Sequence, residues 1–157
     1  MTARTTGLHS PTVFVACCSQ KLKSAAPARD LYCSDLFRKA RAWTERQTGS
    51  WYILSAKHGL VHPDELLSPY DQSLNDLSAA GRKAWAREVE RQMQSASLRG
   101  EACVVLAGRA YRDDLMRFLS TRFGDVHVPL AGLGILSQKA WLKRRLAQQA
   151  AGFAQAA

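Results

Sequence analysis

Apolar residues along this chain occur in two kinds of pattern, short continuous runs and longer segments with helical spacing. The continuous runs are rich in β-branched residues and predict strands at 12–17, 51–56, 102–107 and 126–130. The longer segments place apolar residues every three or four positions and predict helices at 34–47, 78–98, 111–122 and 135–154. Strands and helices therefore alternate along the chain.

This alternation predicts an α/β fold. Strands joined by helices at this spacing form a mainly parallel sheet, here of four to five strands, with helices on both faces. The run at 102–107 is apolar throughout, which is typical of a strand covered on both faces. Pro129 either ends the last strand or places it at an edge of the sheet. We expect a flexible tail at 1–11 and a single domain at 12–157.

The charge balance indicates a polyanionic partner. The formal net charge is +9 and the isoelectric point is near 9.8, which favours nucleic acid, with DNA expected ahead of RNA. Basic residues gather on the first and last predicted helices, where they could contact phosphates. They are Arg38, Lys39, Lys139, Lys143, Arg144 and Arg145. The alternative is that each of them only solvates a helix face.

Several other classes of protein are disfavoured. No apolar stretch approaches the roughly 20 residues that cross a bilayer, and the start of the chain lacks a secretory signal, so we expect a cytoplasmic protein without membrane contact. The cysteines and histidines form no zinc-type cluster, and neither a Walker nor a G-x-G-x-x-G motif occurs. We therefore expect no metal and no cofactor, and the oligomeric state stays open.

The carboxyl ends of the predicted strands carry most of the candidate chemistry, because a parallel sheet places its ligand crevice outside these ends. Candidate substrate-binding residues follow the strands there, or lie in Gly-containing turns that could offer backbone N–H groups. They are Cys18, Ser19, Ser55, Gly59, Tyr70, Gly108, Arg109 and Gly132. Polar loops give a similar pattern without a ligand, and Tyr70 could either pack in the core or stack on a base.

Four ionisable residues are candidates for catalysis. Lys21 follows a buried strand end, where partial burial would make its amine a nucleophile. His58 suits proton transfer near neutral pH, and Lys57 lies beside it. Asp71 could position water or stabilise a cationic, sugar-like transition state. Each of the four could instead be an ordinary surface or turn residue.

The loop after the second strand resembles the signature loop of YaaA-type peroxide-stress proteins. The matching positions are Ser55-x-x-x-Gly59-Leu60-x-x-Pro63-x-x-x-x-x-Pro69-Tyr70, without gaps. The resemblance implies DNA binding and a part in protection from oxidative damage. Asp71 departs from the pattern, because it stands where the family has an arginine.

An earlier segment is similar to two known motifs. Cys18-Ser19-Gln20-Lys21 resembles both the Ser-x-x-Lys segment of the YaaA family and the Cys-Ser-x-Lys motif of archaeosine synthase. Archaeosine synthase modifies a 7-deazaguanine base within tRNA through a lysine adduct. The resemblance therefore implies a role for Lys21 in chemistry on a nucleobase.

Together, these features predict an enzyme that handles a modified or damaged nucleobase in a nucleic acid, by glycosylase-like base removal or by base exchange or modification. One alternative is a non-catalytic DNA-binding protein of stress protection. Another is a small-molecule nucleoside or nucleotide transferase. The enzyme hypothesis requires Lys21 and Ser55 to border one cavity.

Overall fold

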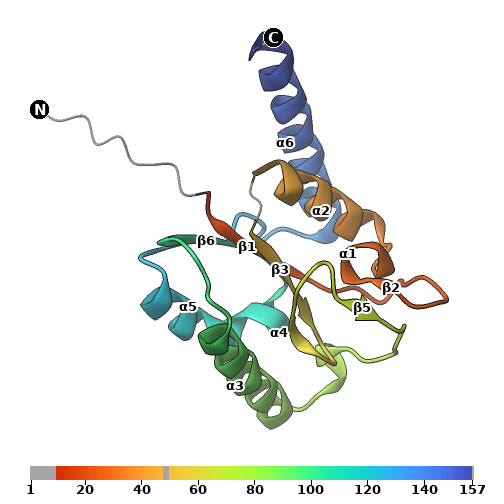
Figure 1. The fold of residues 1–157 in the computed structure, drawn as a ribbon, viewed down its shortest axis with the longest axis vertical. Coiled ribbons are helices and arrows are strands. Elements are labelled where there is room, and N and C mark those ends of the chain that lie inside the picture. The colour runs from red at the N-terminus through yellow and green to blue at the C-terminus, as the bar shows by residue number, and fades with distance from the viewer. Residues whose placement is uncertain (1–9, 48–49, 157) are drawn as a thin grey trace, which may run out of the picture.

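The structure, a computed structural model, describes residues 10–47 and 50–156, so most of the predicted tail lies outside the described residues. A five-stranded sheet forms its centre (Figure 1). Its strands are β1 (Thr12–Ala16), β3 (Trp51–Ser55), β4 (Gly59–Val61), β6 (Ala102–Leu106) and β7 (Asp125–His127). They lie in the order β4–β3–β1–β6–β7.

The sheet is mainly parallel. β1, β3, β6 and β7 run in one direction, and β4 pairs antiparallel with β3 at one edge. The predicted α/β class, with a mainly parallel sheet in one domain, is confirmed. The last strand is shorter than predicted and occupies the other edge, where Pro129, which has no N–H to donate, lies beyond its end.

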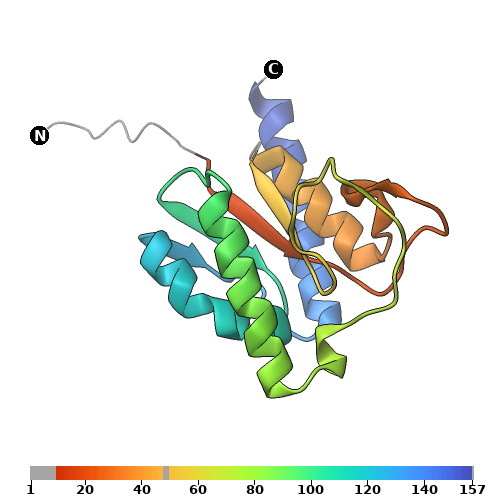
Figure 2. The same cartoon turned by 60° about the horizontal axis from the view of Figure 1, so that its bottom comes forward.

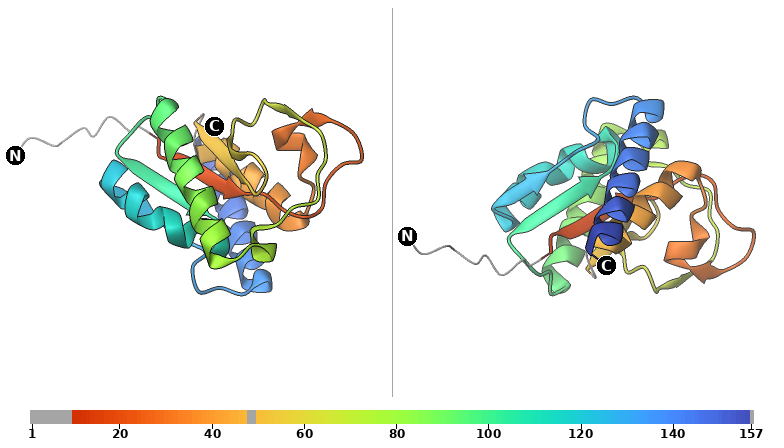
Figure 3. Two further views of the ribbon diagram at one scale, coloured as in Figure 1. Left: turned by 90° about the horizontal axis from the view of Figure 1, so that it is seen from below. Right: turned by 90° about the horizontal axis from the view of Figure 1, so that it is seen from above.

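Long helices cover both faces of the sheet. α2 (Asp35–Gln47) and α6 (Ile135–Ala156) lie on one face, and α3 (Ala79–Ser95) and α5 (Met116–Arg122) lie on the other (Figure 2 and Figure 3). Within 10–47 and 50–156, none of the helices combines the length and apolar character that crossing a membrane requires.

Alternate residues of β1 divide the core into two layers. Val13 and Val15 pack in the cluster that contains Phe37 of α2, whereas Phe14 packs in the cluster that contains Val89 of α3. Successive side chains of a strand point to opposite faces, so a strand covered on both faces must be apolar at every position. This is why the central strands appear in the sequence as continuous apolar runs.

Several short elements were not predicted. They are the edge strand β4, β2 (Ala26–Pro27), α1 (Ala28–Leu31), β5 (Leu66–Leu67), the 3₁₀ turn η1 (Leu74–Asp76), α4 (Arg109–Arg112) and the 3₁₀ turn η2 (Asp113–Leu115). β2 and β5 form a separate two-stranded antiparallel sheet. The helix predicted at 111–122 is divided into α4, η2 and α5. Arg112, the last residue of α4, turns back toward β6 and donates a hydrogen bond from Nη1 to Ala107 O at 3.0 Å.

The connections of the sheet diverge between β1 and β6. The chain leaves β1 through α2 toward β3, and it leaves β6 through α5 toward β7, on the opposite side and face. Such a point opens a crevice at the carboxyl ends of the two strands. The order and connections of the strands are therefore enough to predict a ligand site at this edge of the sheet.

Candidate active site

A cavity of about 240 Å³ lies at the carboxyl ends of β1 and β6, where the connections diverge. Cys17 and Cys18 line it after β1, and Gly108, Arg109 and Tyr111 line it after β6. The remaining polar wall comes from η1 and from the starts of α2 and α6, through Asn75, Ser34 and Gln138. The cavity thus occupies the usual ligand position of an open α/β sheet.

Local hydrogen bonds hold the polar wall of the cavity. Ser34 caps α2, because its Oγ accepts a hydrogen bond from Phe37 N at 3.1 Å. Gln138, in the first turn of α6, donates from Nε2 to Leu133 O at 2.9 Å. Hydroxyl and carboxamide groups are therefore fixed beside apolar side chains, which is the mixture that binds small ligands.

Three hydroxyl groups form a hydrogen-bonded row next to the cavity. Tyr70 OH lies 2.6 Å from Tyr32 OH and 2.6 Å from Ser55 Oγ. Ser55 Oγ also accepts hydrogen bonds from the backbone N–H of Lys57 at 3.3 Å and of His58 at 3.0 Å. Since these two bonds use both lone pairs of the hydroxyl, Ser55 donates to Tyr70.

Two amines and an imidazole surround the Tyr70 ring. Lys21 Nζ lies 4.4 Å from the ring centroid, and Lys57 Nζ lies 5.9 Å from it. The His58 ring meets Tyr70 edge to face, with the centroids 5.4 Å apart. The segment after β1 and the loop after β3 therefore meet at Tyr70, with Ser55 at its hydroxyl and Lys21 at its ring.

Backbone pairing holds Lys21 in place. Lys21 forms an isolated antiparallel bridge with Tyr32, flanked by hydrogen bonds from Leu22 N to Leu31 O and from Cys33 N to Gln20 O, both 2.9 Å long. Its amine lies 3.4 Å from Ser19 O and 5.8 Å from the Tyr32 ring centroid. The amine is thus presented from an anchored segment of backbone.

Cys17 connects the cavity with the hydroxyl row. It lines the cavity, and its thiol lies 3.5 Å from the hydroxyl of Tyr111 on the far wall. Negative charge on Cys17 would also act on Tyr70, whose pKa is raised first by burial and then by that thiol. Cys17 and Tyr70 also pack against the same core cluster, so the cavity and the residues around Tyr70 are neighbours.

Burial controls the ionisation of this site. It raises the pKa of Tyr32 to about 12 and raises that of Tyr70 as well, so both phenols stay protonated at neutral pH. For His58, burial and then the charge of Lys57 lower the pKa. His58 is therefore a neutral imidazole near pH 7 and can accept a proton.

The predicted site residues divide into three groups. Cys18, Gly108 and Arg109 line the cavity, whereas Lys21, Lys57, His58, Ser55 and Gly59 gather around Tyr70 and its loop. Neither Lys21 nor Ser55, which were expected to border one cavity, is part of the wall of this cavity. Ser19 and Asp71 are exposed and are not part of the cavity wall, and Asp71 makes no hydrogen bond or ion pair with any residue of the described ranges. Gly132 lies outside the cavity wall, in an exposed turn where it adopts a φ of 76°.

The sequence did not identify five residues of the site: Cys17, Tyr32, Asn75, Tyr111 and Gln138. Cys17 ends an apolar run, and Tyr32 lies in a short segment before the first predicted helix, so neither position stands out in the sequence. The signal that could have found Tyr111 was its position just after Gly108-Arg109, at a strand end that had already been chosen.

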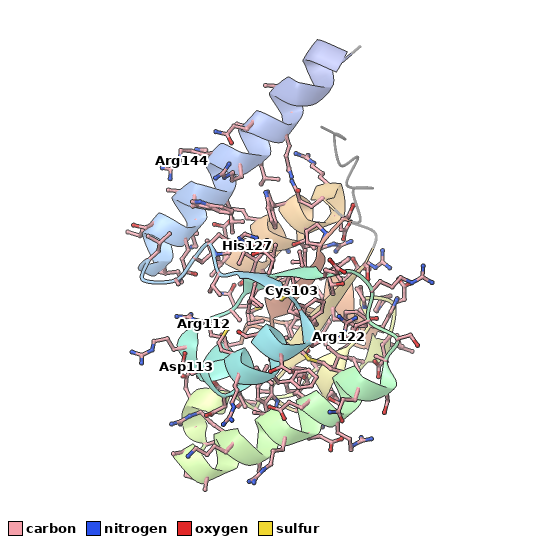
Figure 4. All side chains as sticks on the ribbon, turned by 90° about the vertical axis from the view of Figure 1, so that its left-hand side faces the viewer. Cys103, Arg112, Asp113, Arg122, His127 and Arg144 are labelled. Atoms are coloured by element: carbon pink, nitrogen blue, oxygen red, sulfur yellow. The ribbon has the colours of Figure 1, made fainter. Side chains whose placement is uncertain are left out.

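The predicted phosphate-binding residues are only partly free. Lys39 and Lys139 both pair with Asp35, at 2.5 Å and 3.6 Å, which joins α2 to α6. The Arg145 guanidinium lies 5.0 Å from the Trp141 ring centroid. Arg38, Lys143 and Arg144 are exposed, and Arg144 points away from the body of the molecule (Figure 4).

Among the described residues, no three His, Cys, Asp or Glu side chains come together in a group that could hold a metal ion. No curated protein matches the chain, and no solved structure matches it. The model of one family matches residues 12–144, a range that contains both the cavity and the residues around Tyr70. The chain therefore belongs to DUF6884, a family of unknown function.

Proposed function

We propose that this chain is an enzyme that acts on a modified or damaged nucleobase of a nucleic acid, by removing, exchanging or modifying that base. The observations that carry the proposal are the cavity between the ends of β1 and β6, and the lysine amine and neutral imidazole that meet at the Tyr70 ring. An enzyme that works on a base must take it out of the stack into such a pocket. The resemblance of Cys18-Ser19-Gln20-Lys21 to the motif of archaeosine synthase also supports chemistry on a nucleobase.

The wall of the cavity suits a heterocyclic base. Asn75 and Gln138 carry carboxamides, and Ser34 carries a hydroxyl, so the wall contains both donors and acceptors for the edge of a base. Arg109, exposed at the rim, could contact a phosphate of the same nucleotide. Ser55 is fully committed to the loop and to Tyr70, so we assign it to positioning rather than to base binding.

Base removal assigns a task to each nearby group. The oxygen of a water bonds to C1′ of the sugar while the C1′–N bond breaks, the base leaves with the bonding electrons and gains a proton, and the water loses one. His58 would accept the proton of the water, and Asp71 would stabilise the positive charge that develops on the sugar. In exchange, the neutral Lys21 amine would bond to C1′ while the C1′–N bond breaks, and it would pass a proton to His58. The incoming base would then bond to C1′, lose a proton and release the Lys21 amine.

Mass spectrometry of nucleosides and free bases from treated DNA and tRNA tests the proposal. Wild-type protein should release or alter a base, and Lys21→Ala and Asp71→Asn should lose this activity. Lys23→Ala is the matched control, because Lys23 is an exposed lysine two positions away. Unchanged DNA and tRNA after treatment with the wild-type protein, or equal activity in all variants, would overturn the assignment.

The small cavity also supports a second candidate, a transferase for free nucleosides or nucleotides. Its volume of about 240 Å³ lies just below the range of about 300–1,000 Å³ that is usual for pockets of drug-sized ligands, so it suits one small ligand. In that case a free nucleoside would be converted directly, and long DNA would not increase the turnover. Conversion of the base only within a polymer would exclude this candidate.

A further inference from the structure

A second hollow lies away from the cavity, between α6 and the strands β6 and β7. It has a volume of about 420 Å³, and Trp43 of α2, Trp141 of α6 and His127 of β7 contribute to its wall. Arg145, Gln148 and Gln149 line it from the later turns of α6. We call this site the tryptophan hollow. His127 lies on the side of the sheet that faces α6 (Figure 4).

The hollow offers flat π surfaces. The rings of Trp43 and Trp141 meet at 61°, with their centroids 5.7 Å apart. The Arg145 guanidinium lies 5.0 Å from the Trp141 ring centroid, and Arg145 is exposed, so it can move aside or stack on an incoming ring. Heterocyclic bases stack on indole rings and on guanidinium planes in this way.

The hollow also offers hydrogen-bonding groups without negative charge. None of its lining residues is acidic, and Gln148 and Gln149 contribute carboxamides. Gln149 donates from Nε2 to Trp43 O at 3.3 Å, whereas its buried Oε1 receives no hydrogen bond from the described residues. A buried acceptor without a donor is uncommon in proteins, and a donor on a bound heterocycle or a water could satisfy it.

Positive charge borders the hollow along α6, whereas on β7 the Asp125 carboxylate lies 2.8 Å from Nε2 of the lining residue His127. Arg145 lines the hollow, and Lys143 and Arg144 are exposed on the neighbouring turn of α6. We propose that the tryptophan hollow binds a nucleobase that carries phosphate, with the base stacked at Trp141 and Arg145 and the phosphate among the basic residues of α6. The base could belong to a free nucleotide or to a single-stranded nucleic acid, since the chemistry of recognition is the same. This binding does not depend on chemistry in the cavity.

Tryptophan fluorescence of the full chain, with calorimetry, tests this inference. The probes are adenosine monophosphate, ribose 5-phosphate and a hexamer of deoxyadenosine nucleotides. Adenosine monophosphate or the hexamer should bind and quench the fluorescence, whereas ribose 5-phosphate, which lacks a base, should not. Tighter binding of the hexamer would identify a strand as the ligand, and equal binding would identify a free nucleotide.

Variants locate the binding. Arg145→Ala should weaken binding at least about fivefold, as expected for the loss of one stacking partner, and Gln148→Ala should weaken it less. Arg87→Ala is the matched control, because Arg87 is an exposed arginine of α3, on the opposite face of the sheet from the hollow. Equal affinity in Arg145→Ala and wild type would overturn the inference, as would the absence of saturable binding. Loss of binding in Asn75→Ala with no effect of Arg145→Ala would assign the ligand to the cavity, which overturns this inference and leaves the proposed function intact.

Discussion

Tyr70 is the residue through which the parts of the candidate site meet. Its hydroxyl lies between Tyr32 and Ser55, and its ring faces Lys21 and His58. Burial raises its pKa, so the phenol stays neutral and keeps both hydrogen bonds at physiological pH. Tyr70 is therefore better suited to holding the site together than to reacting in it.

Replacing Tyr70 with phenylalanine should destabilise the fold. The change leaves the hydroxyls of Ser55 and Tyr32, which are 0% and 1% exposed, without their shared partner. An unpaired buried polar group costs about 1–3 kcal/mol, and urea unfolding would measure this loss. Tyr52→Phe is the control, because the Tyr52 hydroxyl makes no hydrogen bond with the described residues. An equal loss of stability in the two variants would contradict the role given to Tyr70.

Lys57 should tune the proton affinity of His58. Because the charge of Lys57 helps to lower the pKa of His58, Lys57→Ala should raise that pKa toward its ordinary value. Below that ordinary value, near pH 6.5, protonation of His58 opposes the folded state, so this small contribution to stability is lost as the pH falls. An NMR titration of the imidazole C–H signals would measure the shift, with Lys23→Ala as the control. A pKa that stays unchanged or falls further would contradict the account.

At the residue scale, the sequence predicted which ionisable groups lie near one another better than it predicted their hydrogen-bond partners. Lys21, Lys57 and His58 were chosen because they follow buried strands, and all three side chains lie around Tyr70. Tyr32 was missed because its hydrogen bond to Tyr70 joins positions 38 residues apart, and such a contact leaves no local pattern. Ser55 was predicted to bind substrate; its partners, which come from the folded loop, support the positioning role that we propose instead.

The turn between β3 and β4 shapes the loop that carries the site. Gly59 adopts a φ of 74°, and a Cβ at this position would lie 2.2 Å from Oε1 of Gln92 on α3. The same Oε1 accepts a hydrogen bond from Leu60 N at 2.7 Å, and Gln92 Nε2 donates to His58 O at 3.0 Å. Through Gln92, α3 therefore hydrogen-bonds both sides of the turn and restrains the backbone of His58.

Gly59→Ala should destabilise the protein more than Gly132→Ala. Both glycines have positive φ, but nothing lies within 4 Å of a Cβ at Gly132. The φ penalty alone is about 1–2 kcal/mol, and displacing Gln92 from two backbone partners adds about 1–3 kcal/mol. Urea unfolding of the two variants would measure the difference. Equal destabilisation would show that Gln92 does not restrain the turn.

At the element scale, the length of a strand or helix decides whether its hydrophobic pattern can be recognised in the sequence. β1, β3 and β6 were predicted because each is a continuous, largely apolar run, and α2, α3 and α6 because each repeats its apolar face over several turns. β4 has three residues and α4 has four, which is too short for either period to be recognised. The antiparallel edge and the broken helix after Gly108 therefore depend on tertiary contacts.

The whole molecule encloses ionisable groups that must remain neutral. Cys103 on the central strand β6 is 0% exposed, and burial, with a contribution from the nearby Asp125 carboxylate, raises its pKa to about 12. A thiol in the unfolded chain ionises near pH 8.5. Between these values the unfolded state holds fewer protons than the folded state, so stability falls as the pH rises.

Alkaline pH should therefore unfold the wild-type protein more readily than Cys103→Ala. Above about pH 9, ionisation of this thiol in the unfolded chain lowers the free energy of unfolding by up to about 1.4 kcal/mol per pH unit. Urea unfolding at about pH 8 and about pH 10 would measure this slope. Val104→Ala is the control, because it truncates the next residue of β6 and keeps the thiol. A slope in Cys103→Ala as steep as in wild type would contradict the burial of a neutral thiol.

The central claim, at the scale of the whole molecule, is that the divergence point of the sheet holds a nucleobase. Protection of thiols from iodoacetamide tests it most directly, because Cys17 and Cys18 line the cavity whereas the half-buried Cys33 does not. Peptide mass spectrometry would follow alkylation of each cysteine with nucleosides, oligonucleotides or tRNA present. The account predicts that at least one of these ligands slows alkylation of Cys17 and Cys18 and leaves Cys33 unaffected. Unchanged alkylation of both cavity thiols with every ligand would contradict it.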